Sequence, residues 1–203
     1  MLLRIDNDKP DQRRIQQVVD CLKDGGVIIY PTDSVYTMGC DMYNRKAFEK
    51  ICRYKGVKPE RANFSIVCYD LSHLSDFTKS IRNATYKLMH RLLPGPYTFI
   101  LKSSKLVSRQ LGFKKPEVGI RVPNHEIPRA IIKELGNPIF SASIKHSDEI
   151  LEYMTDPEEI HEEFQNLVDI VIDGGPGGNV ATTIIDYTGD EPWLVRAGLG
   201  STD

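Results

Sequence analysis

Residues 27–39 constrain the fold more than any other stretch of this chain, because an apolar run ends there abruptly in polar side chains. The run Val-Ile-Ile-Tyr is typical of a buried strand, and a Gly-Gly turn precedes it. Pro31 lacks the N–H that a sheet ladder needs, so we predict that the strand ends there. Four polar side chains follow at its carboxyl end: Thr32, Asp33, Ser34 and Tyr36. Open α/β sheets usually bind ligands at that edge, although an ordinary capped turn would carry the same residues.

Helical and strand-like patterns alternate along the rest of the chain. We predict helices over Asp11–Leu22, after caps at Asn44 and Asn83, over Glu126–Leu135, and from a start at Thr155-Asp156-Pro157-Glu158 to Phe164. We predict strands over Val27–Tyr30, Ser65–Cys68, Tyr97–Leu101, Val118–Val122, Ile139–Ala142, Val168–Ile172, Thr183–Asp186 and Trp193–Val195. This order indicates an α/β fold with a mixed, twisted sheet and flanking helices. No repeat or linker divides the chain, so we expect a single domain over residues 1–203.

Composition places the chain among soluble globular proteins. Its 203 residues suffice for one sizeable core, and 40% are hydrophobic and 27% charged. No apolar run approaches the roughly 20 residues of a membrane helix, and the N-terminus is charged too early for a signal peptide. The four cysteines show no Cys-x-x-Cys spacing, so we expect reduced core thiols. These features predict a cytoplasmic protein without membrane association.

The net charge of −2 hides two segments of opposite sign. Residues 79–116 hold nine lysines and arginines and no acidic residue, whereas residues 148–173 hold ten acidic residues and no lysine or arginine. The basic segment is typical of a groove for phosphate or nucleic acid. Solvated helix faces of opposite sign would give the same pattern. We favour an anionic ligand, because the basic segments surround the other motifs.

Motifs of several enzyme classes are missing from the sequence. The five histidines lack the paired spacing of a zinc protease, and no Gly-x-Ser-x-Gly nucleophile elbow is present. The glycine-rich segment 173–179 is neither a Walker loop nor a dinucleotide fingerprint. It can cradle an anion with backbone N–H groups or form an ordinary turn, and we favour the turn. Arg196, isolated after a strand pattern, suits either a phosphate or carboxylate clamp or a structural salt bridge.

Six further motifs follow the first stretch in a fixed order. They are Tyr54-Lys55-Gly56, Leu93–Thr98, Val118–Pro123, Phe140–Ser143, Ala181–Asp186 and Val195–Gly198. In this order and spacing the chain resembles the YrdC/Sua5/YciO/YwlC family, from about its first helix to Gly200, and it looks closest to the YciO-type branch. The resemblance implies a twisted α/β sheet with a concave, positively charged face.

The family's well-studied members make L-threonylcarbamoyladenylate from threonine, bicarbonate and ATP, and they release pyrophosphate. The product feeds the threonylcarbamoyladenosine modification of tRNA. The resemblance therefore implies a nucleotidyltransferase that binds these three substrates, with Mg²⁺ accompanying the ATP. Such chemistry needs fixed positive charge, because developing anions must be stabilised. We can name no Mg²⁺ ligand from the sequence.

The resemblance implies roles for ten residues of this chain. It implies catalytic charges at Lys55, Arg121 and Lys58. It implies substrate contacts at Thr32, Tyr36, Ser141, Ser143 and Thr182. It implies nucleotide contacts at Lys55, Asn63, Ser141 and Arg196. Lys55 matches the lysine of the family's Lys-x-Arg signature, and Arg121 matches an arginine that the family places near the substrate carboxylate.

The chain departs from the family pattern at three positions. Val57 stands where Lys-x-Arg has its arginine, and the neighbouring Lys58 offers only a point charge in its place. Ser143 replaces the asparagine of a Ser-x-Asn signature, and Cys68 replaces a frequent histidine. Loss of one transition-state donor costs roughly 2.7–4 kcal/mol of activation free energy. We therefore expect reduced or altered activity relative to the well-studied members.

Three functional hypotheses stay open at this point. The first is the threonylcarbamoyladenylate synthase, and the second is a nucleotide-binding protein with related chemistry on another substrate. The third is a protein that binds double-stranded RNA or tRNA on its basic face without this catalysis. No aromatic-rich RNA signature accompanies the basic segment, which weighs against the third. The sequence leaves the oligomeric state open.

Overall fold

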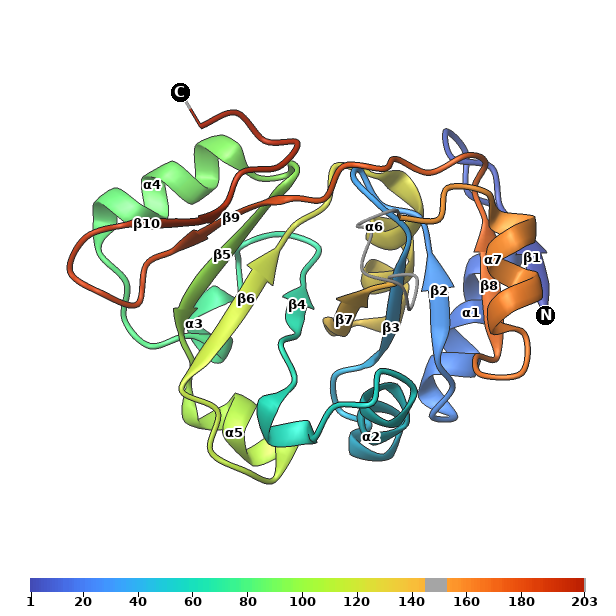
Figure 1. Cartoon of the computed structure of the whole chain (residues 1–203), viewed down its shortest axis with the longest axis horizontal. Helices are drawn as coiled ribbons and strands as arrows, with labels where there is room; N and C mark the ends of the chain where they lie inside the picture. The colour runs from blue at the N-terminus through green and yellow to red at the C-terminus, as the bar shows by residue number, and fades with distance from the viewer. Residues whose placement is uncertain (145–152, 203) are drawn as a thin grey trace.

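One mixed β-sheet with helices packed on both faces forms the centre of the molecule (Figure 1). The structure is a computed structural model, and it describes residues 1–144 and 153–202. Its strands are β1 (Leu2–Arg4), β2 (Ile28–Tyr30), β3 (Thr37–Asp41), β4 (Ser65–Val67), β5 (Tyr97–Lys102), β6 (Glu117–Arg121), β7 (Ile139–Ser143), β8 (Ile170–Asp173), β9 (Thr183–Asp186) and β10 (Trp193–Arg196). Its α-helices are α1 (Gln12–Lys23), α2 (Arg45–Tyr54), α3 (Leu74–Phe77), α4 (Asn83–Leu92), α5 (Lys105–Leu111), α6 (Glu126–Leu135) and α7 (Pro157–Phe164), and a 3₁₀ helix, η1, spans Pro59–Arg61.

The strand order across the sheet is β1-β8-β2-β3-β7-β4-β6-β5-β9-β10. Strands β1 and β2 run parallel to β8, β4 runs parallel to β6, and β5 runs parallel to β9. The other neighbouring pairs are antiparallel. The predicted α/β fold with a mixed sheet and flanking helices is therefore confirmed.

Strand β2 is buried on both faces, as its uninterrupted apolar run indicates. Ile29 belongs to the large core cluster on one face of the sheet. Ile28 and Tyr30 belong to the cluster on the other face, where the apolar sides of α1 and α6 pack. The period of two along a strand explains this division, because successive side chains point to opposite faces.

The segment after Pro31 is a hairpin loop, which the sequence analysis did not anticipate. Strand β3 returns antiparallel to β2 and pairs Tyr30 with Thr37. Residues 31–36 therefore connect two paired strands. We missed β3 because Thr-Met-Gly-Cys-Asp lacks the β-branched run of a typical strand, and its glycine weakens the pattern further. Strand β1 and helices α3 and α5 were missed as well.

One of the two predicted helix caps is present, and the helix predicted to begin at Asp11 has a cap as well. Asp11 accepts a hydrogen bond from the Arg14 N–H, and Asn44 accepts one from the Ala47 N–H. The predicted cap at Asn83 is wrong, because Asn83 is already the first residue of α4. The residue at the capping position is Arg82, which makes no side-chain cap.

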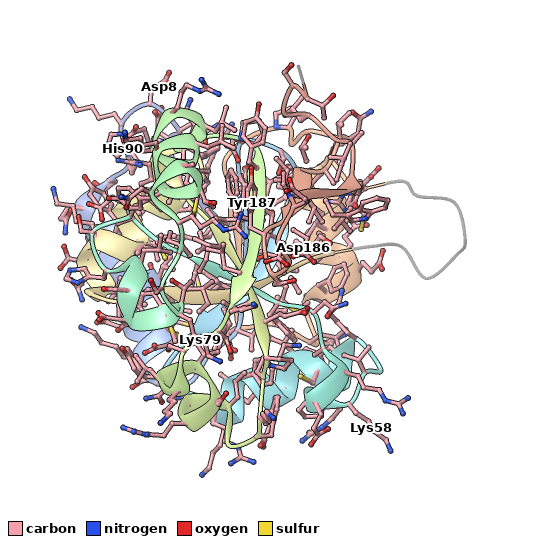
Figure 2. All side chains as sticks on the ribbon, turned by 90° about the vertical axis from the view of Figure 1, so that its left-hand side faces the viewer. Asp8, Lys58, Lys79, His90, Asp186 and Tyr187 are labelled. Atoms are coloured by element: carbon pink, nitrogen blue, oxygen red, sulfur yellow. The ribbon has the colours of Figure 1, made fainter. Side chains whose placement is uncertain are left out.

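The nine basic residues of segment 79–116 do not share one environment. Eight of them are exposed, among them Lys79 (Figure 2), and several belong to α4 and α5. The ninth, Lys115, is half-buried. Of the acidic segment, Asp148, Glu149 and Glu152 lie outside the described residues. Most of the basic segment is therefore a solvated surface.

Two expectations from composition can be compared with the structure. The four cysteines are free thiols, and three of them are buried. Burial raises the pKa of the Cys68 thiol to about 12, so that thiol stays protonated at neutral pH. Among the described residues, no helix is long and apolar enough to cross a membrane.

Phe48 occupies the centre of an aromatic group in the larger core cluster. Its ring centroid lies 4.5 Å from that of Phe64, 5.3 Å from that of Phe140 and 6.4 Å from that of Phe113. Phe48 is 1% exposed. One side chain of α2 thereby joins β7 to the segments before β4 and before β6.

We predict that Phe48→Ala lowers the free energy of unfolding by about 3–5 kcal/mol, because it leaves a cavity that rigid neighbours cannot fill. Urea unfolding measures the change. The control is Tyr86→Ala on α4, where the side chain is 41% exposed and the expected change is within about 0.5 kcal/mol. Equal losses in the two variants would contradict the central position of Phe48.

Candidate functional site

Side chains from the central strands and their loops surround a cleft of about 600 Å³. Seven of the ten residues named in the sequence analysis line it: Lys55, Asn63, Arg121, Ser141, Ser143, Thr182 and Arg196. The other three, Thr32, Tyr36 and Lys58, are not among the lining residues. The fold thus collects into one space residues that are up to 141 positions apart (196 − 55) in the chain.

Three small residues that line the cleft, Ser65, Gly119 and Ser141, lie in register on neighbouring strands, and Gly39 continues their row outside the cleft lining. Gly39 pairs with Ser141, Ser141 with Ser65, and Ser65 with Gly119. Residues that pair across strands share a face of the sheet, so these four form a row. A Cβ at Gly119 would lie 2.8 Å from the Ser65 hydroxyl. Larger residues at positions 65, 119 and 141 would fill the cleft.

A hydrogen-bond chain determines what the Ser141 hydroxyl can offer a ligand. The Tyr30 hydroxyl lies 2.7 Å from Ser141 Oγ, which donates to the Met38 carbonyl at 3.2 Å. Burial raises the pKa of Tyr30 to about 12, so its phenol remains a donor to Ser141. Ser141 Oγ therefore retains acceptor capacity for a donor group of a ligand.

Arg121 and Asp33 form a buried ion pair at the wall of the cleft. Arg121 Nη2 lies 3.1 Å from Asp33 Oδ1, and the two side chains are 8% and 9% exposed. Arg121 Nη2 also donates to Ser34 Oγ at 3.2 Å, while Asp33 Oδ2 accepts the Asn124 N–H at 2.9 Å. Arg121 Nε is buried and has no hydrogen-bond partner among the described residues. These contacts fix the Arg121 guanidinium, and its Nε–H is still without a hydrogen-bond acceptor among the described residues.

Thr32 and Tyr36 stabilise the hairpin loop from outside the cleft. Thr32 Oγ1 donates to the Val35 carbonyl at 2.7 Å and accepts the Ser34 N–H at 3.2 Å. The Tyr36 hydroxyl donates to the Gly175 carbonyl at 2.7 Å. Both residues thus shape the loop that carries Asp33. Direct substrate contacts for Thr32 and Tyr36 stay a prediction.

The glycine-rich segment 173–179 packs against this loop. Three of its N–H groups are used inside the protein: Gly174 donates to the Tyr36 hydroxyl, Gly175 to Asp173 Oδ1 and Gly177 to the Thr155 carbonyl. A Cβ at Gly178 would lie 2.0 Å from the Ser34 carbonyl oxygen. These contacts favour the turn over an anion cradle, and they explain why glycines are needed.

Arg196 and Thr182 form a further part of the cleft wall. Arg196 donates from Nε and Nη2 to the Thr182 carbonyl at 3.1 and 2.9 Å. Thr182 Oγ1 lies 2.9 Å from Thr98 Oγ1 on β5. Within the described part of the chain, no acidic side chain pairs with Arg196. The geometry therefore favours the clamp over the structural salt bridge.

Two lysines complete the positive charge of the cleft. Lys55 Nζ donates to the Ser143 carbonyl at 2.8 Å, and Lys115 Nζ donates to the Ala62 carbonyl at 2.7 Å. Burial lowers the pKa of the Lys115 ammonium. With Arg121 and Arg196, four cations line the cleft against one carboxylate, Glu117, among the residues that the structure describes. Such an excess attracts anions.

The positions that depart from the family pattern lie outside the cleft or at its edge. Val57 is 37% exposed, and Lys58 is exposed at the periphery of the molecule (Figure 2). Neither lines the cleft, whereas Ser143 does. Cys68 is 5% exposed and belongs to the core cluster. The catalytic charge expected of Lys58 stays a prediction without support from its position.

The residues present do not form a metal site of their own. Among the described residues, no group of three or more His, Cys, Asp or Glu side chains could hold an ion. Glu117 is the carboxylate of the cleft. Mg²⁺ commonly binds through one or two carboxylates together with substrate phosphates. The expected Mg²⁺ would therefore depend on a nucleotide for most of its ligands.

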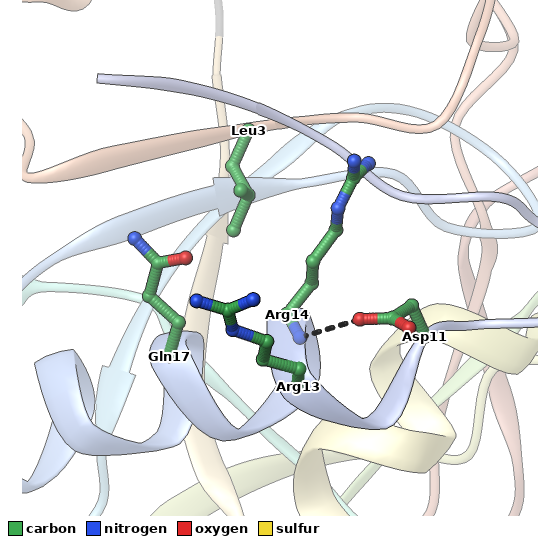
Figure 3. A pocket seen from close by; sticks show the side chains of 5 residues that line it. All are labelled: Leu3, Asp11, Arg13, Arg14 and Gln17. Carbon is green, nitrogen blue, oxygen red and sulfur yellow. Dashed lines mark hydrogen bonds between the residues drawn. The ribbon is translucent and has the colours of Figure 1, made fainter.

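A second hollow of about 440 Å³ lies between β1 and α1 (Figure 3). Leu3, Arg13, Arg14 and Gln17 line it, and Asp11 caps the helix there (Figure 3). None of the ten residues named in the sequence analysis belongs to it. We therefore place the candidate site in the larger cleft.

Sequence reasoning missed five polar residues that line the cleft: Thr37, Ser65, Thr98, Lys115 and Glu117. Thr98 alternates with the buried Phe99 in β5, so the period of a strand could have revealed it. Lys115 carried no comparable signal, since it is one of many lysines in a basic segment. Its burial follows from how two distant segments meet.

Comparisons with known proteins place the chain within a family. Residues 20–198 match the family Sua5_yciO_yrdC, described as telomere recombination. The chain is 43% identical over 195 residues to the uncharacterized protein YciO of Escherichia coli, covering 95% of this chain and 93% of that protein. It is 30% identical over 187 residues to the threonylcarbamoyl-AMP synthase of Bacillus subtilis, covering 91% of this chain and 53% of the synthase.

Solved structures agree with these matches. The crystal structure of E. coli YciO aligns with a TM-score of 0.90 at 40% identity, covering 99% of this chain and 97% of the other. Sua5 of P. abyssi complexed with L-threonine aligns with a TM-score of 0.87 at 26% identity, covering 98% of this chain and 57% of that one. The chain spans about half the length of the synthases it matches.

Replacing Asp33 with asparagine should lower the free energy of unfolding by about 3–5 kcal/mol, because Arg121 would be left as an uncompensated buried charge. Denaturant unfolding measures this loss. Glu49→Gln removes an exposed pair with Arg45 and serves as the control, with an expected change below about 1 kcal/mol. If Asp33→Asn were no more destabilising than the control, the pair would not stabilise the loop.

His125, beside this pair, provides a test that depends on pH. Its Nδ1 accepts the Ile127 N–H and caps α6, and burial lowers its pKa, opposed by Asp33 and Glu126. The unfolded chain, with an ordinary pKa near 6.5, therefore binds the proton more readily.

We expect stability from His125 to be present above pH 6.5 and to be lost as the pH falls through its lowered folded pKa. Urea unfolding at pH 7.5 and pH 5 should show a larger loss in the wild type than in His125→Asn, which keeps a capping group without the titration. Equal losses of unfolding free energy in the wild type and the variant would show that protonation of His125 does not destabilise the fold.

Proposed function

The chain belongs to the Sua5/YciO/YrdC family, and from this premise we propose that its cleft makes threonylcarbamoyl-AMP from threonine, bicarbonate and ATP. Threonine and bicarbonate first give the carbamate of threonine, with loss of water. An oxygen of that carbamate then attacks the α-phosphorus of ATP, and the bond to the departing pyrophosphate breaks. The product would supply a threonylcarbamoyl group for tRNA modification.

The observation that carries this proposal is the charge of the cleft. Four cations surround a floor of small hydroxyl and glycine residues. Both the carbamate and ATP are anions, and the departing pyrophosphate gains charge in the transition state. Preorganised cations stabilise such charge without reorganising at the moment of reaction. The relatives named threonylcarbamoyl-AMP synthase support the choice of substrates.

The two arginines suit different parts of these substrates. Arg121 is held by Asp33 and Ser34 and has a buried Nε without a partner, which a carboxylate of threonine could satisfy. Arg196 is bound to Thr182 on one side of its guanidinium, so its other side can face a phosphate of the nucleotide. Lys55 adds a point charge for the phosphates.

Neither ATP nor Mg²⁺ needs a site beyond this cleft. Its volume is typical of a small-molecule site. Mg²⁺ bound to the nucleotide would neutralise part of the phosphate charge. Glu117 is the cleft carboxylate that could reach such an ion's shell. The protein's own contribution is to bind the anions and to align the carbamate oxygen with the α-phosphorus and the departing pyrophosphate.

One observation favours a second candidate, a nucleotide- and double-stranded-RNA-binding protein without this catalysis. Eight basic residues of segment 79–116 are exposed on the surface, and the family arginine and asparagine are replaced by Val57 and Ser143. RNA binding on that face would weaken steeply with salt, because each neutralised phosphate releases counterions. Binding of a small substrate in the cleft need not weaken with salt in this way.

The deciding experiment is mass spectrometry of the purified protein after incubation with ATP, threonine, bicarbonate and Mg²⁺. We expect threonylcarbamoyl-AMP and pyrophosphate from the wild type. Lys55→Ala should lower the rate about 10²–10³-fold, as loss of one transition-state contact does. Lys46→Ala is the matched control, because Lys46 is exposed on the same helix and away from the cleft.

A threonylcarbamoyl-AMP synthase assayed in parallel shows that the conditions support the reaction. Absence of product with this enzyme active would contradict the proposal. RNA binding that falls with salt would then support the second candidate. Equal rates for Lys55→Ala and Lys46→Ala would show that the chemistry occurs outside this cleft.

A further inference from the structure

The cleft carries a cation that the sequence analysis did not single out. Lys115 lies in the loop between α5 and β6 and reaches the segment that leads into β4, where its Nζ donates to the Ala62 carbonyl. It is half-buried, unlike the eight other basic residues of its segment. An ammonium has three donors, so this contact leaves two for a ligand.

Lys115 and Lys55 lie at the same end of the cleft. Lys55 Nζ is bound to the carbonyl of Ser143, at the end of β7. Lys115 precedes Glu117, at the start of β6. Because β4 is parallel to β6 and antiparallel to β7, the start of β4 joins these two strand ends. Arg121 lies at the opposite end of β6, where Asp33 compensates its charge.

Among the described residues, Glu117 is the one carboxylate that acts on the pKa of Lys115. Burial lowers its pKa, and the two groups that oppose this shift are Glu117, which is exposed, and Cys52. The pKa of Cys52 is itself raised to about 11, so its thiol is neutral at pH 7. An anion that binds beside a partly desolvated cation of this kind stabilises its charged form.

We propose that Lys115 is a phosphate-binding residue of the cleft, which together with Lys55 holds the part of a nucleoside triphosphate that leaves as pyrophosphate. A triphosphate tail carries several charges and needs more than one cation, whereas a single carboxylate does not. Lysine ammonium groups bind phosphate as point charges. Lys115, and not Lys58, then supplies the second lysine charge. This inference rests on the proposed function only in requiring a nucleotide in the cleft.

Calorimetric titration of three ligands tests the assignment: ATP, pyrophosphate and adenosine. The variant is Lys115→Met, which keeps the length and apolar stem of the side chain without its charge. We expect the affinities for ATP and pyrophosphate to fall about 10- to 100-fold, the effect of one charge-assisted hydrogen bond, and the affinity for adenosine to stay unchanged. Lys115→Arg should restore most of the ATP affinity.

Lys114→Met is the matched control. Lys114 is the exposed neighbour of the same charge and does not line the cleft, so this variant should bind all three ligands as the wild type does. If Lys115 only ties two loops together, Lys115→Met will weaken binding of adenosine as much as of ATP and lower the unfolding temperature. That result would overturn the assignment, as would unchanged affinities.

The experiments distinguish a failure of the Lys115 assignment from a failure of the proposed function. A wild type that binds ATP without making threonylcarbamoyl-AMP contradicts the function, and the affinities still decide the role of Lys115. A wild type that binds neither ATP nor pyrophosphate overturns the inference itself. Product formation by the wild type together with unaltered pyrophosphate binding in Lys115→Met overturns the inference alone.

Discussion

The buried ion pair between Arg121 and Asp33 connects the parts of the molecule on which the site depends. Arg121 ends β6, near the middle of the sheet, and Asp33 belongs to the hairpin loop between β2 and β3. Two buried charges are costly to desolvate, so each needs the other and its further hydrogen bonds. Asn124 and Ser34 supply those bonds. The ion pair therefore holds the loop against the cleft wall. Loss of either partner would leave the other charge buried and uncompensated.

This arrangement has a consequence for interpreting variants of Arg121. Arg121→Ala removes a candidate carboxylate-binding group and at the same time leaves Asp33 buried without its cation. Lost activity in that variant would not separate binding from folding. Lys55 donates to a backbone carbonyl at the rim, where its residue is exposed, so its removal affects the fold less. The chemistry of the cleft is therefore better assigned through its lysines than through its most buried arginine.

Patterns local in the chain predicted much of this fold. The apolar run of β2, the amphipathic helix that follows Asp11 and the cap at Asn44 each depend on neighbouring residues, and the structure contains them as expected. Strand β3 was missed because its place in the sheet comes from pairing with β2 and β7, not from its own propensity. Most of the residues to which the family resemblance gave roles line the cleft, whereas Thr98 stood in a quoted motif without a role, and the strand period could have assigned it one.

Lys115 and Lys58 show where sequence reasoning reaches its limit. Lys58 stands one position from the missing arginine, so proximity along the chain favoured it as the replacement cation. In space the segment around η1 turns Lys58 outward, and a loop more than fifty residues later brings Lys115 to the Ala62 carbonyl of the same segment. Charge in a cleft is thus supplied by whichever element the sheet order brings beside it. A cation lost from one strand's loop can be replaced from a neighbouring strand's loop, and no window of the sequence contains both.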